Sequence, residues 1–369
     1  MISKALTAAA YHRKLELIAA EPGVELAAVV PPVWLEPGVG EYRLEVAEGS
    51  NYRLHVLPLR HNGRHHTYTW RGLPAVVEAE RPDILHIDEE AFNLSTWQAL
   101  RLGRRLGARM CFYNWANIDR FYPPPFRQFE RAAFRHAAHA LAGNHEAAEI
   151  IKAHGYRGPV TVIPQFGVDE ELFLPAEDAP DAAPRPFVVG FFGRLMRSKG
   201  IEELLEAMEL LPDDLHLRLI GQGELSEQVA ARIAAAPLAG RVTLEPLIPS
   251  GQVPAAMREL HAYALPSRTT ATWKEQFGRV LIEAMASGVP VVGSSSGEIP
   301  HVIGEAGLIF PEGDAAALAA ALRRLYDDEQ LRRSLRAAGR QRVLDTYTQR
   351  SVARQYVAVY RSMLEAPAP

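Results

Sequence analysis

The segment EQFGRVLIEAMASG, from Glu275 to Gly288, carries the residue types best suited to hold a hydroxyl-rich ligand. Seven residues separate Glu275 from Glu283. A helix that begins near Phe277 would place Glu283 about two turns along it and leave Glu275 in the preceding loop. Carboxylates accept hydrogen bonds from sugar and ribose hydroxyls without requiring one particular hydroxyl rotor. We therefore predict that both carboxylates contact a ligand.

The start of this helix is also suited to bind an anion, because it is the positive end of the helix dipole. The backbone amides that would meet a phosphate there belong to Phe277, Gly278, Arg279 and Val280. The alternative is structural: Glu275 would be an ordinary acidic residue at a helix start, and Glu283 a surface residue. Glu283, however, has apolar neighbours on both sides, which is unusual for a solvated acid.

A second loop, GRLMRSKG, follows the apolar segment FVVGFFG and leads into a helix. In an open α/β sheet, ligands bind beyond the carboxyl ends of the strands, where the backbone N–H groups of a helix start favour anions. Gly193 lets the backbone turn, and Arg194 and Lys199 supply two cations that suit a diphosphate. For this loop alone, ordinary solvated charges are the simpler interpretation.

A third strand-to-helix loop, LIGQGE, contains Gly221 in a G-x-G pattern. The third glycine of a dinucleotide fingerprint is absent, and no acidic residue stands at the usual distance after it. A nicotinamide-dependent oxidoreductase is therefore a weak interpretation. A glycine turn that packs near another ligand is the better one.

These loops require parallel sheets to position them. Apolar strand segments alternate with amphipathic helical segments along both halves of the chain, which predicts two doubly wound α/β domains. The run LPAEDAPDAAPRP between the halves has the composition of a linker. We place the first domain at residues 1–178 and the second at 187–348. A C-terminal helix at about 349–366 should pack back on the first domain.

Polar residues follow two predicted strands of the first half, DILHI and RMCFYNW, and should face a cleft at the strand ends. With a tyrosine from the first loop, they are candidates for contacts with an acceptor or with the transferred group: Tyr11, Glu89, Glu90, Asn114 and Asn117. Helix caps and turns explain such residues equally well, because Asp and Asn favour them.

The composition excludes several classes of protein. The net charge is -4, and Lys and Arg are mixed with Asp and Glu, so we expect no nucleic-acid partner. The single cysteine, Cys111, lies in an apolar strand segment and fits a buried thiol in a reducing compartment. No apolar run has the length of a signal peptide or a membrane span. We expect cytoplasmic residence, and leave open the oligomeric state and peripheral contact with the inner face of the membrane.

Metal dependence is not expected. The adjacent histidines in HNGRHH lie in a loop with Gly and Arg, where exposed side chains are commoner than ligands, and the chain has no DxD motif. Arg194, Lys199 and helix amides can take the place of a cation. We therefore predict neither a metal nor a cofactor.

Five segments of the second half, taken in their order, resemble the C-terminal half of glycosyltransferase family 4, the retaining GT-B enzymes. They are GRLMRSKG, LIGQGEL, ALPS, EQFGRVLIEAMASGVPVV and GLIFPEGD. The resemblance implies two Rossmann-like domains facing each other across a cleft, with a nucleotide diphosphate-sugar bound mostly to the second. By position, it assigns Arg194 and Lys199 to the diphosphate, Glu275 to the transferred sugar and Glu283 to the ribose. Further donor contacts are implied for Gly193, Gly221, Phe277, Gly278, Arg279 and Val280.

The first half resembles the family less closely. Asn144 stands where a serine is frequent, an added Phe166 precedes Gly167, and the chain starts MISKALTAAAYHRK where the family has a full apolar strand and a glycine-rich loop. We therefore expect a short first strand. The resemblance implies transfer of a hexosyl unit, with retention, to a hydroxyl of a glycan, a lipid-linked acceptor or a small molecule. The alternatives are a sugar-nucleotide epimerase of GT-B fold, a nicotinamide-dependent oxidoreductase and a catalytically silent sugar-nucleotide binding protein.

Overall fold

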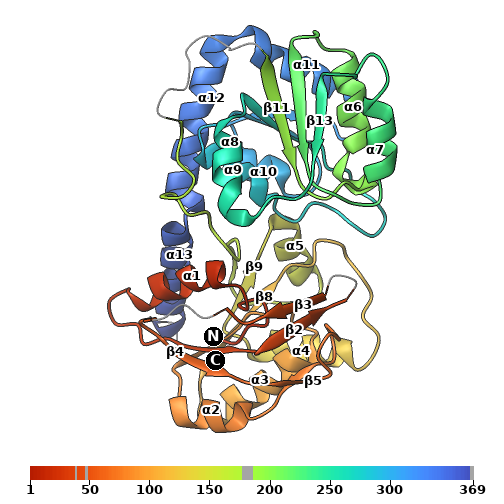
Figure 1. Cartoon of the computed structure of the whole chain (residues 1–369). Helices are drawn as coiled ribbons and strands as arrows, with labels where there is room; N and C mark the ends of the chain where they lie inside the picture. The colour runs from red at the N-terminus through yellow and green to blue at the C-terminus, as the bar shows by residue number, and fades with distance from the viewer. Residues whose placement is uncertain (38–39, 46–48, 177–185, 366–369) are drawn as a thin grey trace. The chain divides into compact units, whose positions relative to one another are not determined.

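The computed structural model describes residues 1–37, 40–45, 49–176 and 186–365, which form two compact units (Figure 1). Unit 1 consists of Met1–Gly167 and Gln349–Pro369, and unit 2 of Val168–Thr348. The boundary predicted between residues 178 and 187 therefore lies earlier, after Gly167. The reason is pairing between residues far apart in the sequence: Val168 bridges Thr348, and the Arg340 guanidinium donates to the Phe173 carbonyl. Residues 177–185, most of the predicted linker, lie outside the described residues.

Unit 2 contains a parallel sheet of six strands in the order β13-β12-β11-β14-β15-β16. The strands are β11 (Phe187–Phe192), β12 (Leu215–Ile220), β13 (Val242–Glu245), β14 (Ala262–Leu265), β15 (Val291–Ser294) and β16 (Leu308–Phe310). The chain runs outward from β11 to β13 and then returns to β14 on the other side of β11. Loops that leave β11 and β14 therefore flank the switch point, where open α/β sheets bind their ligands.

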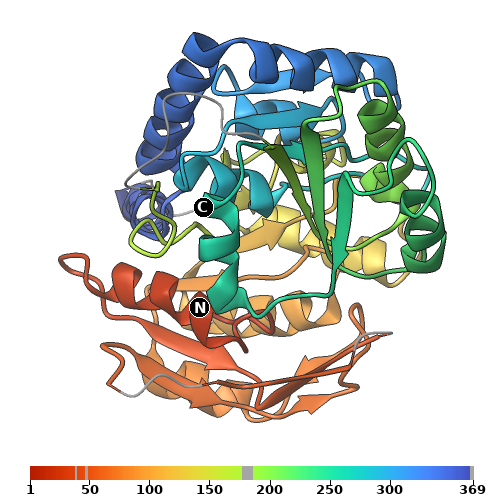
Figure 2. The ribbon, with the colours of Figure 1, turned by 45° about the horizontal axis from the view of Figure 1, so that its top comes forward.

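Helices cover both faces of this sheet (Figure 2). They are α6 (Ile201–Glu209), α7 (Ser226–Ile233), α8 (Val253–Arg258), α9 (Arg279–Ala286), α10 (Ile299–Ile303), α11 (Ala315–Asp327) and α12 (Glu329–Arg342). Helix α6 packs beside α11, whereas α9 packs with α8, α10 and α12. Because both faces are covered, the central strands are continuous apolar runs, as the sequence shows for FVVGFF.

Unit 1 also has a parallel sheet, which one residue completes. Ile2 bridges Val29 on one side and Ile87 on the other, so the expected short first strand is a single residue long. It joins the pair β1-β4 to the run β7-β8-β9-β10. The strands are β1 (Ala27–Val30), β4 (Arg53–Val56), β7 (Ile84–Ile87), β8 (Arg109–Asn114), β9 (His139–Ala142) and β10 (Val160–Val162).

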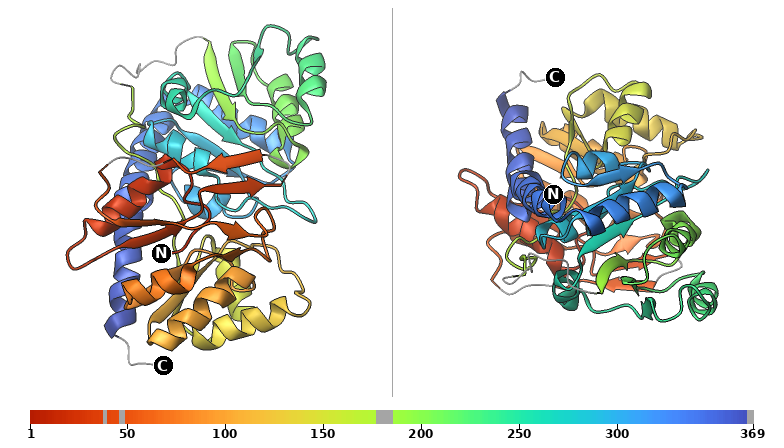
Figure 3. Two further views of the ribbon diagram at one scale, coloured as in Figure 1. Left: turned by 60° about the horizontal axis from the view of Figure 1, so that its bottom comes forward. Right: turned by 90° about the horizontal axis from the view of Figure 1, so that it is seen from above.

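Strand β8 shows how this sheet is covered on both sides. Cys111 and Tyr113 enter one apolar cluster, and the alternate residues Met110 and Phe112 enter others. The helices are α1 (Ala9–Ala19), α2 (Leu73–Glu80), α3 (Leu94–Leu106), α4 (Phe126–His136), α5 (His145–Ala153) and α13 (Gln349–Glu365). Helix α13 lies against α1 (Figure 3) and contributes Val352 and Tyr356 to the cluster around Cys111.

Two hairpins of unit 1 were not predicted. Antiparallel strands β2 (Val33–Glu36) and β3 (Gly40–Arg43) form one, and β5 (Leu59–Arg60) and β6 (Thr69–Trp70) form the other. Strands this short give too little hydrophobic periodicity to identify. Among the described residues, no helix is long and apolar enough to cross a membrane.

Candidate active site

Lys199 and Glu275 come from different loops of unit 2 and meet as an ion pair. Lys199 ends the 3-10 turn Arg197–Lys199 after β11, and Glu275 follows β14. The Lys199 Nζ lies 2.6 Å from the Glu275 Oε2, and the same oxygen accepts from the Ser267 Oγ at 2.8 Å. Glu275 is only 7% exposed. The structure thus gathers a cation, a carboxylate and a hydroxyl at the carboxyl ends of two central strands.

The aromatic ring of Trp273 completes this group. The Lys199 Nζ lies 4.6 Å from the centroid of the Trp273 ring, within the range of a cation–π interaction. The ring and the Glu275 carboxylate therefore both restrain the ammonium group. Arg194, on the loop after β11, is exposed.

Glycines let these loops pass close to one another. A Cβ at Gly221 would lie 1.8 Å from the Gly193 carbonyl oxygen, so the loops after β11 and β12 touch through their backbones. A Cβ at Gly200, whose φ is +68°, would lie 1.9 Å from the Pro266 carbonyl oxygen. Only glycine fits such approaches, which explains Gly200 and Gly221 without a dinucleotide fingerprint.

The helix predicted to begin near Phe277 begins at Arg279. Gly278 is its N-cap and has a φ of +77°, a left-handed conformation that favours glycine. Phe277 is buried, with its ring centroid 5.7 Å from that of Tyr347, and so belongs to the loop. Arg279 is exposed and Val280 is half-buried at the first turn of α9.

Glu283 is a buried residue, so the surface alternative is wrong. It is 8% exposed, and its Oε1 lies 3.0 Å from the Arg279 Nε one helical turn earlier. Burial raises the pKa of Glu283, while the Arg279 charge opposes that shift. The carboxylate is therefore held next to one cation in an apolar setting.

Sequence reasoning gave no role to Ser267, Trp273 or the loop after β15. Ser267 could have been found because it follows the apolar strand AYAL, as the residues of GRLMRSKG follow FVVGFF. In the loop after β15, the Glu298 N–H donates to the Glu275 carbonyl at 3.1 Å. A Cβ at Gly297 would lie 2.0 Å from that carbonyl oxygen. A third strand end therefore holds Glu275 in place.

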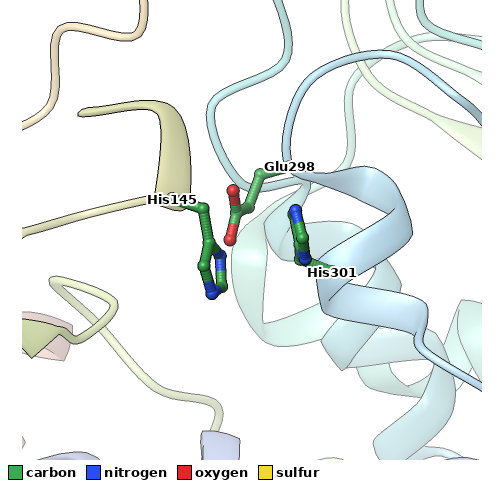
Figure 4. Close-up of side chains that lie close together, drawn as sticks. All are labelled: His145, Glu298 and His301. Atoms are coloured by element: carbon green, nitrogen blue, oxygen red, sulfur yellow. The ribbon is translucent and has the colours of Figure 1, made fainter. Parts of the chain in front are cut away.

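Glu298 and His301 lie at the start of α10, with a carboxylate oxygen and a ring nitrogen within 4.8 Å of each other (Figure 4). Two such ligands are fewer than structural or catalytic zinc sites use. Within either unit taken by itself, the described His, Cys, Asp and Glu side chains do not form a group of three that could hold a metal ion.

In unit 1, Glu90 supports a backbone turn. Its Oε1 accepts from the N–H groups of Trp115 and Ala116, at 2.9 and 3.1 Å, and so ties the end of β7 to the loop after β8. The other carboxylate oxygen is buried and has no hydrogen-bond partner among the described residues. Burial raises the pKa of Glu90 to about 7, against the effect of the two N–H donors.

The other unit 1 candidates are mostly buried. Asn114 is 4% and Asn117 5% exposed. Glu89 is paired with Lys4 at 2.7 Å, which makes it a structural ion pair. Tyr11 stacks on Phe166, with ring centroids 3.8 Å apart.

Gln165 joins the loops that carry these candidates, the loop after β7 and the loop after β8. The Trp115 Nε1 donates to the Gln165 Oε1 at 3.0 Å, and the Gln165 Nε2 donates to Asp88 at 2.8 Å. The residue next to the added Phe166 therefore joins the ends of β7 and β8. The structure places Glu90 and Trp115 together, whereas Tyr11 is linked to them through the segment Gln165–Phe166.

Two family models match the chain. "Glycosyltransferase Family 4" matches residues 20–172, and "Glycosyl transferases group 1" matches residues 176–342. The first falls within unit 1, apart from its last few residues, and the second covers most of unit 2. Neither describes an epimerase or an oxidoreductase.

Relatives and solved structures agree with these matches. The chain is 26% identical to a 2-deoxystreptamine glucosyltransferase of Streptomyces kanamyceticus, over 70% of this chain and 69% of that protein. It is 31% identical to D-inositol 3-phosphate glycosyltransferase 1 of Catenulispora acidiphila, over 66% of this chain and 62% of that protein. Other relatives are matched over about half their length. The structure of Anabaena HepE in complex with UDP has a TM-score of 0.70 at 20% identity, covering 95% of this chain and 96% of that one. The chain belongs to the family 4-like glycosyltransferases and has the GT-B fold.

Proposed function

We propose that this glycosyltransferase transfers a hexosyl unit from a nucleotide diphosphate-sugar to a hydroxyl of a glycan, a lipid-linked acceptor or a small molecule, with retention of configuration. The observation that carries the proposal is the group formed by Lys199, Glu275 and Ser267 at the carboxyl ends of β11 and β14. The family resemblance and a HepE structure of the same fold that contains UDP support a donor of this class.

The proposed chemistry is electrostatic. As the sugar–phosphate bond breaks, negative charge accumulates on the leaving diphosphate, and Lys199 and Arg194 would stabilise it. The Glu275 carboxylate already accepts two hydrogen bonds, from Lys199 and Ser267, so its position is fixed before a ligand arrives. It would hold the transferred sugar by accepting from its hydroxyls, as Glu283 would for the ribose.

The remaining donor contacts would come from backbone. Gly193 and Gly221 bring the backbones of two loops together, and the N–H groups of Phe277 to Val280 lie at the start of α9, where a phosphate would be favoured. These groups and the two cations would do the work of a metal ion, so we propose a reaction that needs neither metal nor cofactor.

The experiment is a thermal-shift screen of nucleotide sugars, followed by an assay for release of the nucleoside diphosphate. A donor at a hundredfold excess over its Kd should stabilise the protein by about 3 kcal/mol. Glu275→Ala should abolish most of that shift and most of the turnover. Glu227→Ala, which removes an exposed acid on α7, is the matched control and should keep both.

Two results would overturn the proposal. One is full donor binding and turnover by Glu275→Ala. The other is an epimerised nucleotide sugar formed in the absence of any acceptor, which would indicate the GT-B epimerase reaction instead.

A further inference from the structure

A pocket of about 390 Å³ lies in unit 2, at the end of the sheet opposite Glu275. Its walls include the residues just before β14 and β15 and one side of α12. Strand β14 is four residues long, so about 13 Å of strand separates this pocket from the loops at the carboxyl ends. We call it the α12 pocket. It is separate from the candidate active site.

The α12 pocket is lined by cations. The described residues around it include three arginines and one histidine and no carboxylate: Arg258, His261, Arg336 and Arg340. Leu260 and Val289 add apolar surface, and Ser287 adds a hydroxyl. The volume lies in the range of small-molecule sites, which are mainly apolar with a few convergent polar groups.

Helix α12 carries a row of three arginines, two of which, Arg336 and Arg340, line the pocket. Arg332, Arg336 and Arg340 are four residues apart and so lie along one side of the helix. Arg332 donates to the carbonyls of Leu325 and Tyr326, and Arg340 to those of Phe173 and Ala286. These acceptors are neutral, but the carboxylates of Asp328 and Glu329 also act on Arg332, and that of Glu170 acts on Arg340. Burial lowers the pKa of Arg340, as expected for a cation taken out of water.

His261 adds a neutral donor to this cationic wall. Its Nδ1 accepts from the Val188 N–H at 2.8 Å, which assigns the ring proton of the neutral form to Nε2. Burial, followed by the charges of Arg336 and Arg332, lowers the pKa of His261 to about 4. Burial is thus the main reason that the ring is neutral, and the charges of two arginines of α12 add to its effect.

We propose that the α12 pocket binds a small phosphorylated metabolite. Arg258 and Arg336 would contact the phosphate, since the guanidinium fork matches its oxygens, and His261 would donate from Nε2. The organic part of the ligand would lie on Leu260 and Val289. This site is independent of the donor site and of the proposed function.

The test measures binding of inorganic phosphate and of glycerol 3-phosphate to the full chain by calorimetry, with chloride at equal ionic strength as the reference. The protein carries Arg194→Ala and Lys199→Ala, so that phosphate bound at the donor site does not contribute. We expect saturable binding with millimolar or tighter affinity, stronger for glycerol 3-phosphate because of its organic part. Glycerol alone should not bind.

Arg258→Gln and Arg336→Gln should each weaken this binding about tenfold, the usual effect of losing one charge-assisted hydrogen bond. The matched control is Arg333→Gln, on the same helix but paired with Glu329 and 56% exposed, and it should bind normally. The pKa of the His261 ring, followed by NMR, should rise when phosphate binds, because an anion favours the imidazolium form.

The proposal is overturned if no saturable binding occurs above the chloride reference. It is also overturned if binding occurs but is the same in Arg258→Gln, Arg336→Gln and Arg333→Gln. If inorganic phosphate binds more tightly than glycerol 3-phosphate, the site accepts only the free ion, and the proposal of a phosphorylated metabolite is overturned. None of these results bears on donor binding by the unmodified protein, so the two proposals are tested separately.

Discussion

The polar strand ends of unit 2 and of unit 1 are built differently. In unit 2, side chains from separate loops meet directly, as Lys199, Glu275 and Ser267 do. In unit 1, Gln165 also joins two loops through side chains, but Glu90 binds backbone: it accepts from the N–H groups of Trp115 and Ala116. Unit 2 therefore presents a preformed cluster of polar side chains, whereas unit 1 presents a turn whose shape depends on a buried carboxylate.

This difference shows what a short motif can encode. The unit 2 group depends on a few glycines that let loops touch, and a glycine's role can be recognised from its place after a strand. The unit 1 arrangement depends on Gln165 and Phe166, which lie far along the chain from Tyr11 and Glu90 and carry no local signature. The following four changes test the contrast, in decreasing order of expected effect.

Lys199→Ala should lower kcat about 10²- to 10³-fold, because a preorganised cation at the leaving group is lost. Steady-state kinetics with saturating donor would measure it. Arg197→Ala, an exposed cation in the same turn, is the control and should retain its rate. An unchanged kcat in Lys199→Ala would mean that the ion pair with Glu275 is only structural.

Glu90→Gln should change how stability depends on pH. The unfolded chain ionises Glu90 near pH 4.5 but the folded protein near pH 7, because burial raises its pKa to about 7. Between these values the folded state holds the extra proton, so the free energy of unfolding falls as pH rises, by up to about 3 kcal/mol. The glutamine variant should lack this component.

Thermal melts of the wild type and Glu90→Gln at several pH values between 4 and 8 would measure the difference. Glu149→Gln, which removes an exposed acid on α5, should follow the wild-type curve. Parallel curves for the wild type and Glu90→Gln would show that Glu90 ionises normally and that unit 1 is more open to water than its burial indicates.

Gly221→Ala should lower stability by about 1–3 kcal/mol and weaken donor binding, because its Cβ would meet the Gly193 carbonyl oxygen at 1.8 Å. Gly251→Ala, where a Cβ would have no neighbour within 4 Å, is the control. Calorimetric melts and donor titrations of both variants would measure the effect. If Gly221→Ala behaves like the control, the contact between the two loops does not shape the donor site.

The smallest of the four effects should be the coupling energy between Tyr11 and Phe166, about 1 kcal/mol for their stacked rings, which Tyr11→Ala removes together with the burial of the Tyr11 ring. A double-mutant cycle with Phe166→Ala would measure the coupling between the two rings. Donor binding should not change, since both rings belong to unit 1. A coupling of zero would leave Tyr11 available as an acceptor contact.

Most of the fold could be predicted because its signals are local. The apolar strands and the amphipathic helices around them identify the two α/β units, and the segment FVVGFF is observed as the strand Phe187–Phe192. The hairpins between Val33 and Trp70 could not be predicted, since their strands are too short for a periodic pattern. The unit boundary was misplaced because the bridge between Val168 and Thr348 joins residues far apart in the sequence.

The candidate site could be predicted only in part, again because local signals are readable and contacts between distant segments are not. The residues after strand ends could be identified one loop at a time, but which of them touch depends on strand order. Nothing in the sequence predicts that Ser267 and Lys199 share one oxygen of Glu275, or that the loop at Gly297 supports it. The α12 pocket was not predicted for a related reason: its arginines come from two helices, and only packing brings them together.

The division of the chain into units also affects the order in which they can form during synthesis. Unit 2 is one continuous segment, Val168–Thr348, so every residue of its core has been made before α13 begins. Unit 1 must wait, because Val352 and Tyr356 of α13 complete the cluster around Cys111. A nascent chain made up to residue 348 therefore contains every residue of unit 2, whereas unit 1 still lacks α13 and keeps part of its apolar surface exposed. Unit 1, although it starts first, is the part that would depend on protection from aggregation.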